Sequence, residues 1–233
     1  MGPAFKKACA KLLKLFNYMQ LCKMKNINAI IFDLGAVILN IDYQKTIKEF
    51  KKLGVENPAC LYSKKTQTNL FNQLEIGKIS ENYFLKKMQK KTNKASFSQI
   101  KNAWNAMLLD LPENRMNLIR KLRKEYQIYL LSNTNIIHIN KLKKNLGEKK
   151  YNTFYNLFDK VYYSHTIGFR KPDKEAFLLI LKNHKLNPKK VLFIDDSPQH
   201  ITGAKNIGIN THHLKNNQDI TTLFPDITLP EHH

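Results

Sequence analysis

The chain of 233 residues has little cysteine and no long hydrophobic run, and each shortage excludes a class of protein. Its 3 cysteines, Cys9, Cys22 and Cys60, are odd in number and lack the spacing of a metal site, which favours a reduced cytoplasmic compartment. No apolar stretch approaches the roughly 18 residues of a membrane-spanning helix. With 42% hydrophobic residues, we expect a soluble globular protein of one α/β domain with an insertion, or of two small domains.

Acidic residues are scarce as well, with 18 Asp+Glu against 39 Lys+Arg, so the formal net charge is +21. A field of this sign attracts nucleic acid, anionic lipid or phosphorylated substrates. Almost all of these cations are lysines, and they are dispersed along the chain rather than gathered into one stripe with interleaved aromatic residues. We therefore interpret them as a solvated surface and expect no nucleic-acid partner.

Residues 1–24 differ from the rest of the chain, because apolar residues such as Leu12 and Phe16 recur at helical spacing with lysines between them. We interpret this segment as a helical extension or a cloning remnant ahead of Met24. The alternative is an amphipathic helix that contacts a membrane surface. A secretory signal peptide is not expected, since lysines interrupt every apolar stretch.

The most informative segment runs from Ile30 to Leu39, where an apolar, β-branched run ends in Asp33. Such a run predicts a buried parallel strand that places Asp33 at its carboxyl end. Ligands of open α/β sheets bind at that edge. Because burying a carboxylate is costly unless it is paired, bound to metal or used in chemistry, Asp33 is a candidate functional residue.

The remaining pattern divides the chain, being mainly helical between Tyr43 and Asp110 and alternating after Leu111. The first part predicts helices at 45–53, 61–74, 80–91 and 96–109, with Ser80 capping the third. The second part predicts a helix at 113–125, a second helix that follows Asp173 and ends at about His184, and a third at 199–206. Strands are expected at 29–32, 128–131, 161–163, 191–194 and 210–214. Alternating strands and helices imply right-handed crossovers and a parallel sheet, so the fold class is α/β.

Three of these strands end in polar residues, and together with one loop they carry a family resemblance. The four segments are Phe32-Asp33-Leu34-Gly35, Leu131-Ser132-Asn133, Arg170-Lys171-Pro172-Asp173 and Phe193-Ile194-Asp195-Asp196-Ser197. This ordered set resembles the phosphatase branch of the haloacid dehalogenase superfamily. The first motif is similar to that of a subgroup that includes sugar-1-phosphate phosphatases.

The resemblance covers Asn26 to about Phe224 and implies a fold. It implies a Rossmann-like parallel sheet flanked by helices, formed by residues 25–43 and 111–233. A small α-helical cap, residues 44–110, is then inserted after the first strand and closes over the site.

The resemblance also implies roles for the motif residues. Asp33 is the nucleophile that forms an aspartyl-phosphate, and Lys171 neutralises charge between the carboxylate and the phosphoryl group. The Ser132 hydroxyl and the backbone N–H groups that follow, beginning with Asn133, bind the phosphoryl oxygens. Taken alone, Ser132 and Asn133 are equally typical of a turn.

A magnesium site is the second implication, because carboxylates provide the hard oxygen ligands that Mg²⁺ prefers. Asp33, Asp196 and the backbone carbonyl of Gly35 are the expected direct ligands, and Asp195 is a direct or an outer ligand. The alternative is that Asp196 caps the following helix. Adjacent acids after a buried strand favour metal, since uncompensated carboxylates repel each other.

Gly35 departs from the family pattern, in which most phosphatases carry a second aspartate as general acid and base. Loss of this general acid and base costs on the order of a hundred- to ten-thousand-fold in rate. Asp42, His165 and His200 are candidate replacements, although we favour a turn residue leading into the cap as the interpretation of Asp42 and a structural role for each histidine. The other solution is a substrate with an acidic leaving group.

These observations predict magnesium-dependent hydrolysis of a small phosphomonoester, such as a sugar phosphate. One alternative is a haloacid dehalogenase, which uses the same nucleophile on a carbon–halogen bond. The other is a non-catalytic protein that binds a phosphorylated ligand and lost its activity with the second aspartate. The substrate itself cannot be inferred, because its choice depends on side chains of the cap.

Overall fold

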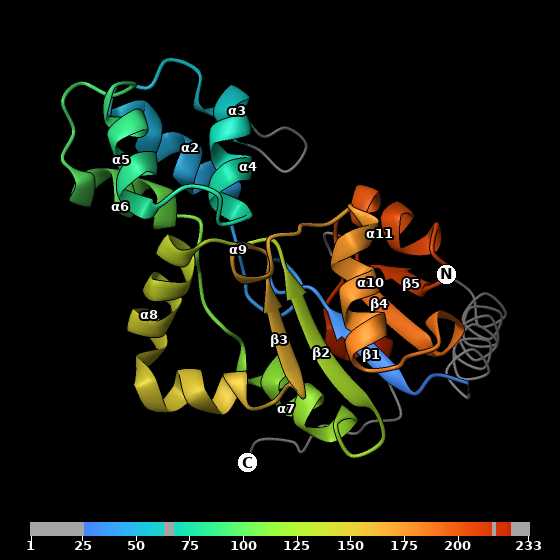
Figure 1. Cartoon of the computed structure of the whole chain (residues 1–233). Helices are drawn as coiled ribbons and strands as arrows, with labels where there is room; N and C mark the ends of the chain where they lie inside the picture. The colour runs from blue at the N-terminus through green and yellow to red at the C-terminus, as the bar shows by residue number, and fades with distance from the viewer. Residues whose placement is uncertain (1–25, 63–67, 216–217, 225–233) are drawn as a thin grey trace, which may run out of the picture.

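The computed structural model describes residues 26–62, 68–215 and 218–224, and the extension 1–24 lies outside them. Its centre is a five-stranded sheet in the order β3-β2-β1-β4-β5, with every neighbouring pair parallel (Figure 1). The strands are β1 (Ala29–Phe32), β2 (Gln127–Ser132), β3 (Lys160–Tyr163), β4 (Val191–Asp195) and β5 (Asn210–His213). The predicted α/β fold with a parallel sheet is therefore confirmed.

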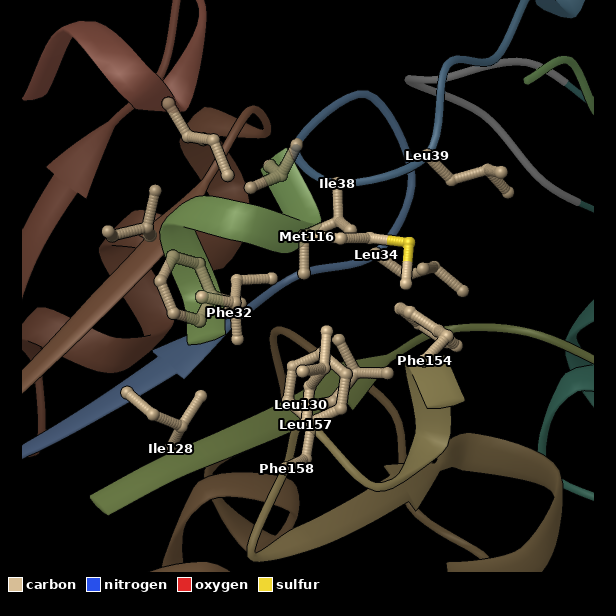
Figure 2. Close-up of a cluster of buried hydrophobic side chains, with 14 of the residues drawn as sticks. Phe32, Leu34, Ile38, Leu39, Met116, Ile128, Leu130, Phe154, Leu157 and Phe158 are labelled. Carbon is tan, nitrogen blue, oxygen red and sulfur yellow. The ribbon is translucent and has the colours of Figure 1, made fainter. Parts of the chain in front are cut away.

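Strand β1 lies in the middle of the sheet and is buried on both faces, which explains its continuous apolar run. Ile30 and Phe32 face one hydrophobic core, part of which is drawn in Figure 2, together with helices α7 (Glu113–Leu122) and α8 (Ile136–Tyr155). Ile31 faces a second core, formed with the helices of the opposite face, α10 (Lys174–Asn183) and α11 (Pro198–Lys205). Two layers of helices thus enclose the sheet.

Helix α8 is the main element that the sequence pattern did not predict. It contains a non-helical residue, Gly147, at φ 73°, where two helical segments meet. The predicted helix 61–74 is wrong as a single element, because α3 (Pro58–Leu61) and α4 (Asn69–Glu75) are separate. The remaining short elements are α9 (Ser164–Ile167), η1 (Pro188–Lys190) and η2 (Ile220–Leu223).

In the described part of the chain between β1 and α7, five helices form a group with its own core, which we call the helical module (residues 43–62 and 68–105). They are α2 (Tyr43–Lys52), α3, α4, α5 (Glu81–Gln89) and α6 (Phe97–Asn105). Trp104 is fully buried at the centre of their aromatic cluster. The Ser80 hydroxyl accepts a hydrogen bond from the Tyr83 N–H, as predicted for the start of α5. The module lies beyond the carboxyl ends of the central strands (Figure 1).

The first turn of α8 joins the module to the rest of the molecule. Ile137 packs in the core of the module, and the ring of His138 stacks on Trp104 at 4.4 Å between centroids. The Nε2 atom of His138 lies 3.2 Å from the Trp104 carbonyl oxygen. Burial lowers the pKa of His138 to about 4, so this ring is neutral near pH 7.

Within the described part of the chain, no helix is long and apolar enough to cross a bilayer.

Candidate active site

The carboxyl ends of three adjacent strands bring the predicted polar residues together. Asp33 follows β1, and its Oδ1 lies 2.5 Å from the Lys171 Nζ. The same ammonium group donates to Asp195 Oδ2 at 2.7 Å and to the Leu131 carbonyl at 2.8 Å. Lys171 is fully buried, so its charge is stabilised by these partners and not by water. Residues 138 positions apart in the chain thereby form one cluster.

Two contacts hold the Lys171 backbone and the residue after it in place. The Asn133 side chain donates to the Lys171 carbonyl at 2.8 Å and accepts from the Lys171 N–H at 2.9 Å. Gly203 of α11 approaches Pro172, the residue after Lys171, so closely that a Cβ on Gly203 would lie 2.4 Å from the Pro172 carbonyl oxygen. Any larger residue at 203 would displace this loop, so glycine is required for the close approach.

The electrostatics of the cluster are unbalanced toward negative charge. Burial raises the pKa of Asp33 to about 7; Lys171 opposes this effect, whereas Asp195 and Asp196 add to it. Burial alone would raise the pKa of Asp195, but Lys171 and His200 lower it to about 2. The two carboxylates beside Lys171 hold its pKa above the ordinary value despite its burial. An additional cation beside Asp33 would therefore favour its ionised form.

The donor set around Asp33 fits such a cation. Asp33, Gly35 and Asp196 line one pocket, and a Cβ built on Gly35 would lie 3.9 Å from Asp33 Oδ2, the carboxylate oxygen that Lys171 does not contact. Asp195 is different, because its Oδ1 accepts from the Ser197 N–H at 2.7 Å and its Oδ2 from Lys171. The described residues contain no group of three His, Cys, Asp or Glu side chains around a metal position. The lining thus offers the carboxylates of Asp33 and Asp196 as oxygen donors.

The residues predicted to bind phosphate lie at the end of β2 and in the loop that follows it. Ser132 is buried and lines the pocket with Asn133 and Thr134. The Ser164 hydroxyl fixes the Thr134 backbone by accepting from its N–H and donating to its carbonyl, each at 2.9 Å. Because the Asn133 side chain is bonded to Lys171, the binding role predicted for Asn133 is restricted to its backbone N–H.

The candidate proton-transfer residues occupy different places. Asp42 caps α2 by accepting from the Gln44 N–H at 2.9 Å, and in the described part of the chain neither Asp42 nor His165 is among the residues that line the pocket. His200 does line it, and its Nδ1 lies 3.0 Å from Asp195 Oδ2. A Cβ on Gly35 would lie 3.0 Å from Ile41 Cδ1, so Ile41 crowds the space that a side chain at 35 would enter.

One part of the pocket wall was not predicted from the sequence. It includes Tyr43, Tyr62, Glu75 and Arg170. One signal was available for Glu75. It follows Phe71 and Leu74 at helical spacing on the buried face of α4, where an unpaired acid would be destabilising. The partner of this acid, Arg170, lies far away in the sequence and could not be inferred.

Comparisons with known proteins agree with this geometry. A family model described as haloacid dehalogenase-like hydrolase matches residues 27–208. The D-ribitol-5-phosphate phosphatase of Bacteroides thetaiotaomicron is 31% identical over 194 residues, which are 83% of this chain and 94% of that protein. A crystal structure of a haloacid dehalogenase family enzyme from the same species, a mutant in complex with magnesium and inorganic phosphate, is 34% identical, with a TM-score of 0.78 over 85% of this chain and 98% of its own. A predicted hydrolase of the same kind from Porphyromonas gingivalis is 29% identical, with a TM-score of 0.76 over 87% and 98% of the two chains.

Proposed function

The chain belongs to the haloacid dehalogenase-like hydrolase family, and we propose that it is a magnesium-dependent phosphatase whose nucleophile is Asp33. The observation that carries this proposal is the buried ammonium group of Lys171, held between Asp33 and Asp195 at the carboxyl edge of the sheet. A site that joins a nucleophilic carboxylate, a fixed cation and oxygen donors suits phosphoryl transfer. Two relatives support it, one named for a phosphatase activity and one crystallised with magnesium and phosphate.

The reaction follows from the positions of these side chains. The Asp33 carboxylate attacks phosphorus, an oxygen–phosphorus bond forms on Asp33, and the ester bond breaks, so that the departing alkoxide takes a proton from water. Lys171 and the Ser132 hydroxyl stabilise the charge on the phosphoryl oxygens. Water then attacks phosphorus, releasing phosphate and the Asp33 carboxylate. Dividing the hydrolysis into two steps replaces one difficult displacement by two easier ones.

Magnesium would be held by Asp33 Oδ2, Asp196 and the Gly35 carbonyl, and it supplies positive charge to offset that of the carboxylates and the phosphoryl group. Asp195 then serves as an outer residue, because its oxygens already accept from Lys171 and the Ser197 N–H. This orientation of the charged groups by bonded neighbours is typical of metal sites.

For the proton transfer that Gly35 cannot perform, we propose His200. It lines the pocket, and its contact with Asp195 through Nδ1 makes Nε2 the ring nitrogen for proton exchange. Burial lowers the pKa of His200, so the ring is neutral near pH 7 and can accept a proton from water. Asp42 is the weaker candidate, because its carboxylate caps α2.

The substrate that we propose is a small sugar or alditol phosphate, by analogy with the relative named for D-ribitol 5-phosphate. The helical module then forms the main part of the predicted cap, residues 44–110, which covers the predicted core of 25–43 and 111–233 and excludes water. The cytoplasmic location and the absence of a nucleic-acid partner stay predictions from composition.

Removing the metal is expected to stop the reaction. With EDTA in place of magnesium, phosphate release from a panel of sugar phosphates should fall at least about a hundredfold, since metal ions stabilise phosphoryl-transfer transition states by several kcal/mol. The measurement is phosphate release with and without added Mg²⁺, with halide release from 2-haloacids as the parallel assay. Halide release that is unaffected by EDTA, without phosphate release, would identify a dehalogenase instead.

A further inference from the structure

An ion pair in the pocket wall has no role in the reaction steps above. Glu75, the last residue of α4, has a side chain that is 3% exposed. Its Oε2 lies 3.2 Å from Nε and 3.1 Å from Nη2 of Arg170, the residue before Lys171. Both side chains line the pocket that contains Asp33. Glu75 thus neutralises Arg170 in a pocket where a negatively charged phosphate ester is expected, so this pair presents no net charge to the ligand.

Two phenol groups complete this part of the wall. The Tyr62 hydroxyl lies 3.5 Å from Glu75 Oε1, and the rings of Tyr43 and Tyr62 lie 5.8 Å apart between centroids. Burial raises the pKa of both phenols, so they are neutral at physiological pH. The wall therefore offers a carboxylate and two hydroxyl groups, and the charge of Arg170 is compensated by Glu75. These groups suit the hydroxyl groups of a ligand, which can both donate and accept hydrogen bonds.

We propose that Glu75 makes the pocket selective for phosphate esters with an uncharged, hydroxylated organic part, and that it rejects esters carrying a second anionic group. This inference rests on the proposed phosphatase function. A hydroxyl of the substrate can exchange hydrogen bonds with this wall, whereas a second carboxylate or phosphate would lose its water there and find no uncompensated cation, because Glu75 already pairs with Arg170. Removing an anion from water without a counter-charge is strongly unfavourable, so the pairing of Arg170 by Glu75 acts against such ligands.

A purely structural role for the ion pair, fixing the helical module on the sheet domain, is not required by the packing. The module is attached elsewhere through the stacking of His138 on Trp104. It also touches α9 where Gly77, at φ 69°, approaches the backbone, since a Cβ there would lie 2.3 Å from the His165 carbonyl oxygen. These contacts do not involve Glu75, which leaves the ion pair as one of several links between the module and the sheet domain.

The test compares two substrates that differ in one charge, an alditol phosphate and the aldonate phosphate with the same carbon chain. We expect wild-type protein with Mg²⁺ to prefer the alditol phosphate by at least about tenfold in kcat/KM. Glu75→Gln should lower that ratio at least about tenfold, whereas Glu75→Asp, which keeps the charge, should retain the preference. The matched control is Glu81→Gln, because Glu81 pairs with Lys101 at 3.1 Å outside the pocket lining in the described residues; it should keep the wild-type ratio.

The outcomes separate this inference from its premise. A wild-type ratio near one, an unchanged ratio in Glu75→Gln, or a ratio lost equally in Glu75→Asp would overturn the selectivity role while leaving the phosphatase function in place. Wild-type protein that hydrolyses neither substrate would overturn the proposed function itself. Thermal melting followed by circular dichroism checks that each variant is folded. If Glu75→Gln does not fold, the wild-type ratio and Glu75→Asp still decide the question.

Discussion

Asp33→Asn is expected to lower phosphate release at least about ten-thousand-fold, because an amide of the same shape cannot attack phosphorus and loss of a nucleophile removes the covalent route. The measurement is kcat and KM for a sugar phosphate with saturating Mg²⁺. Without metal, the variant should be at least as stable toward urea as the wild type. Burial raises the pKa of Asp33 to about 7, so removing its charge relieves an unfavourable ionisation above that pH.

Asp173→Asn is the matched control for this loss. Asp173 lies on the exposed surface two residues after Lys171, and its side chain makes no capping hydrogen bond to α10. Its replacement should leave kcat within a factor of about two, as expected for a surface substitution. Turnover by Asp33→Asn within tenfold of the wild type would mean that another group attacks phosphorus.

Lys171→Met is expected to destabilise the protein by about 3–5 kcal/mol, because it leaves two buried carboxylates, Asp33 and Asp195, without their cation. It should also abolish turnover, since the buried ammonium group that contacts the nucleophile is then lost. The free energy of unfolding in urea, measured at pH 8 without metal, checks the first effect. Glu75 and Arg170 should remain paired.

Lys174→Met provides the comparison for a lysine of the same loop region. Lys174 is exposed at the start of α10, so its loss should change the free energy of unfolding by no more than about 0.5 kcal/mol. Equal stabilities of the two variants would contradict the view that the Lys171 ammonium group holds the site together.

The sheet and the central cluster were predictable because their signals are local. Each of the first two central strands is a short apolar run ending in a polar residue, and parallel pairing brings these ends to one edge. Helix α8 was missed because Gly147 interrupts it and its middle, residues 140–150, is rich in lysine and asparagine, with only Leu142 buried. Its two ends pack against different partners, which no single periodic pattern represents.

Other features of the site depend on contacts between distant segments. The bond between the Asn133 side chain and the Lys171 backbone, 38 positions away, was not predicted. Glu75 and Arg170 are 95 positions apart in the sequence, so their pairing could not be predicted from either residue. Ile41 crowds the space beside Gly35, a consequence of how the chain turns after β1. The motifs therefore predicted the candidate catalytic residues, whereas the pocket wall depends on contacts between distant segments that no motif contains.

The most direct test of Asp33 as nucleophile is to trap its phosphorylated form. Protein with Mg²⁺ is mixed with acetyl phosphate, quenched, and reduced with borohydride, which converts an aspartyl-phosphate to homoserine. Mass spectrometry of the peptide that contains Asp33 should then show homoserine at position 33 in the wild type and no such product in Asp33→Asn. An unmodified Asp33 in protein that turns over phosphate esters, or modification at a different residue, would contradict the account.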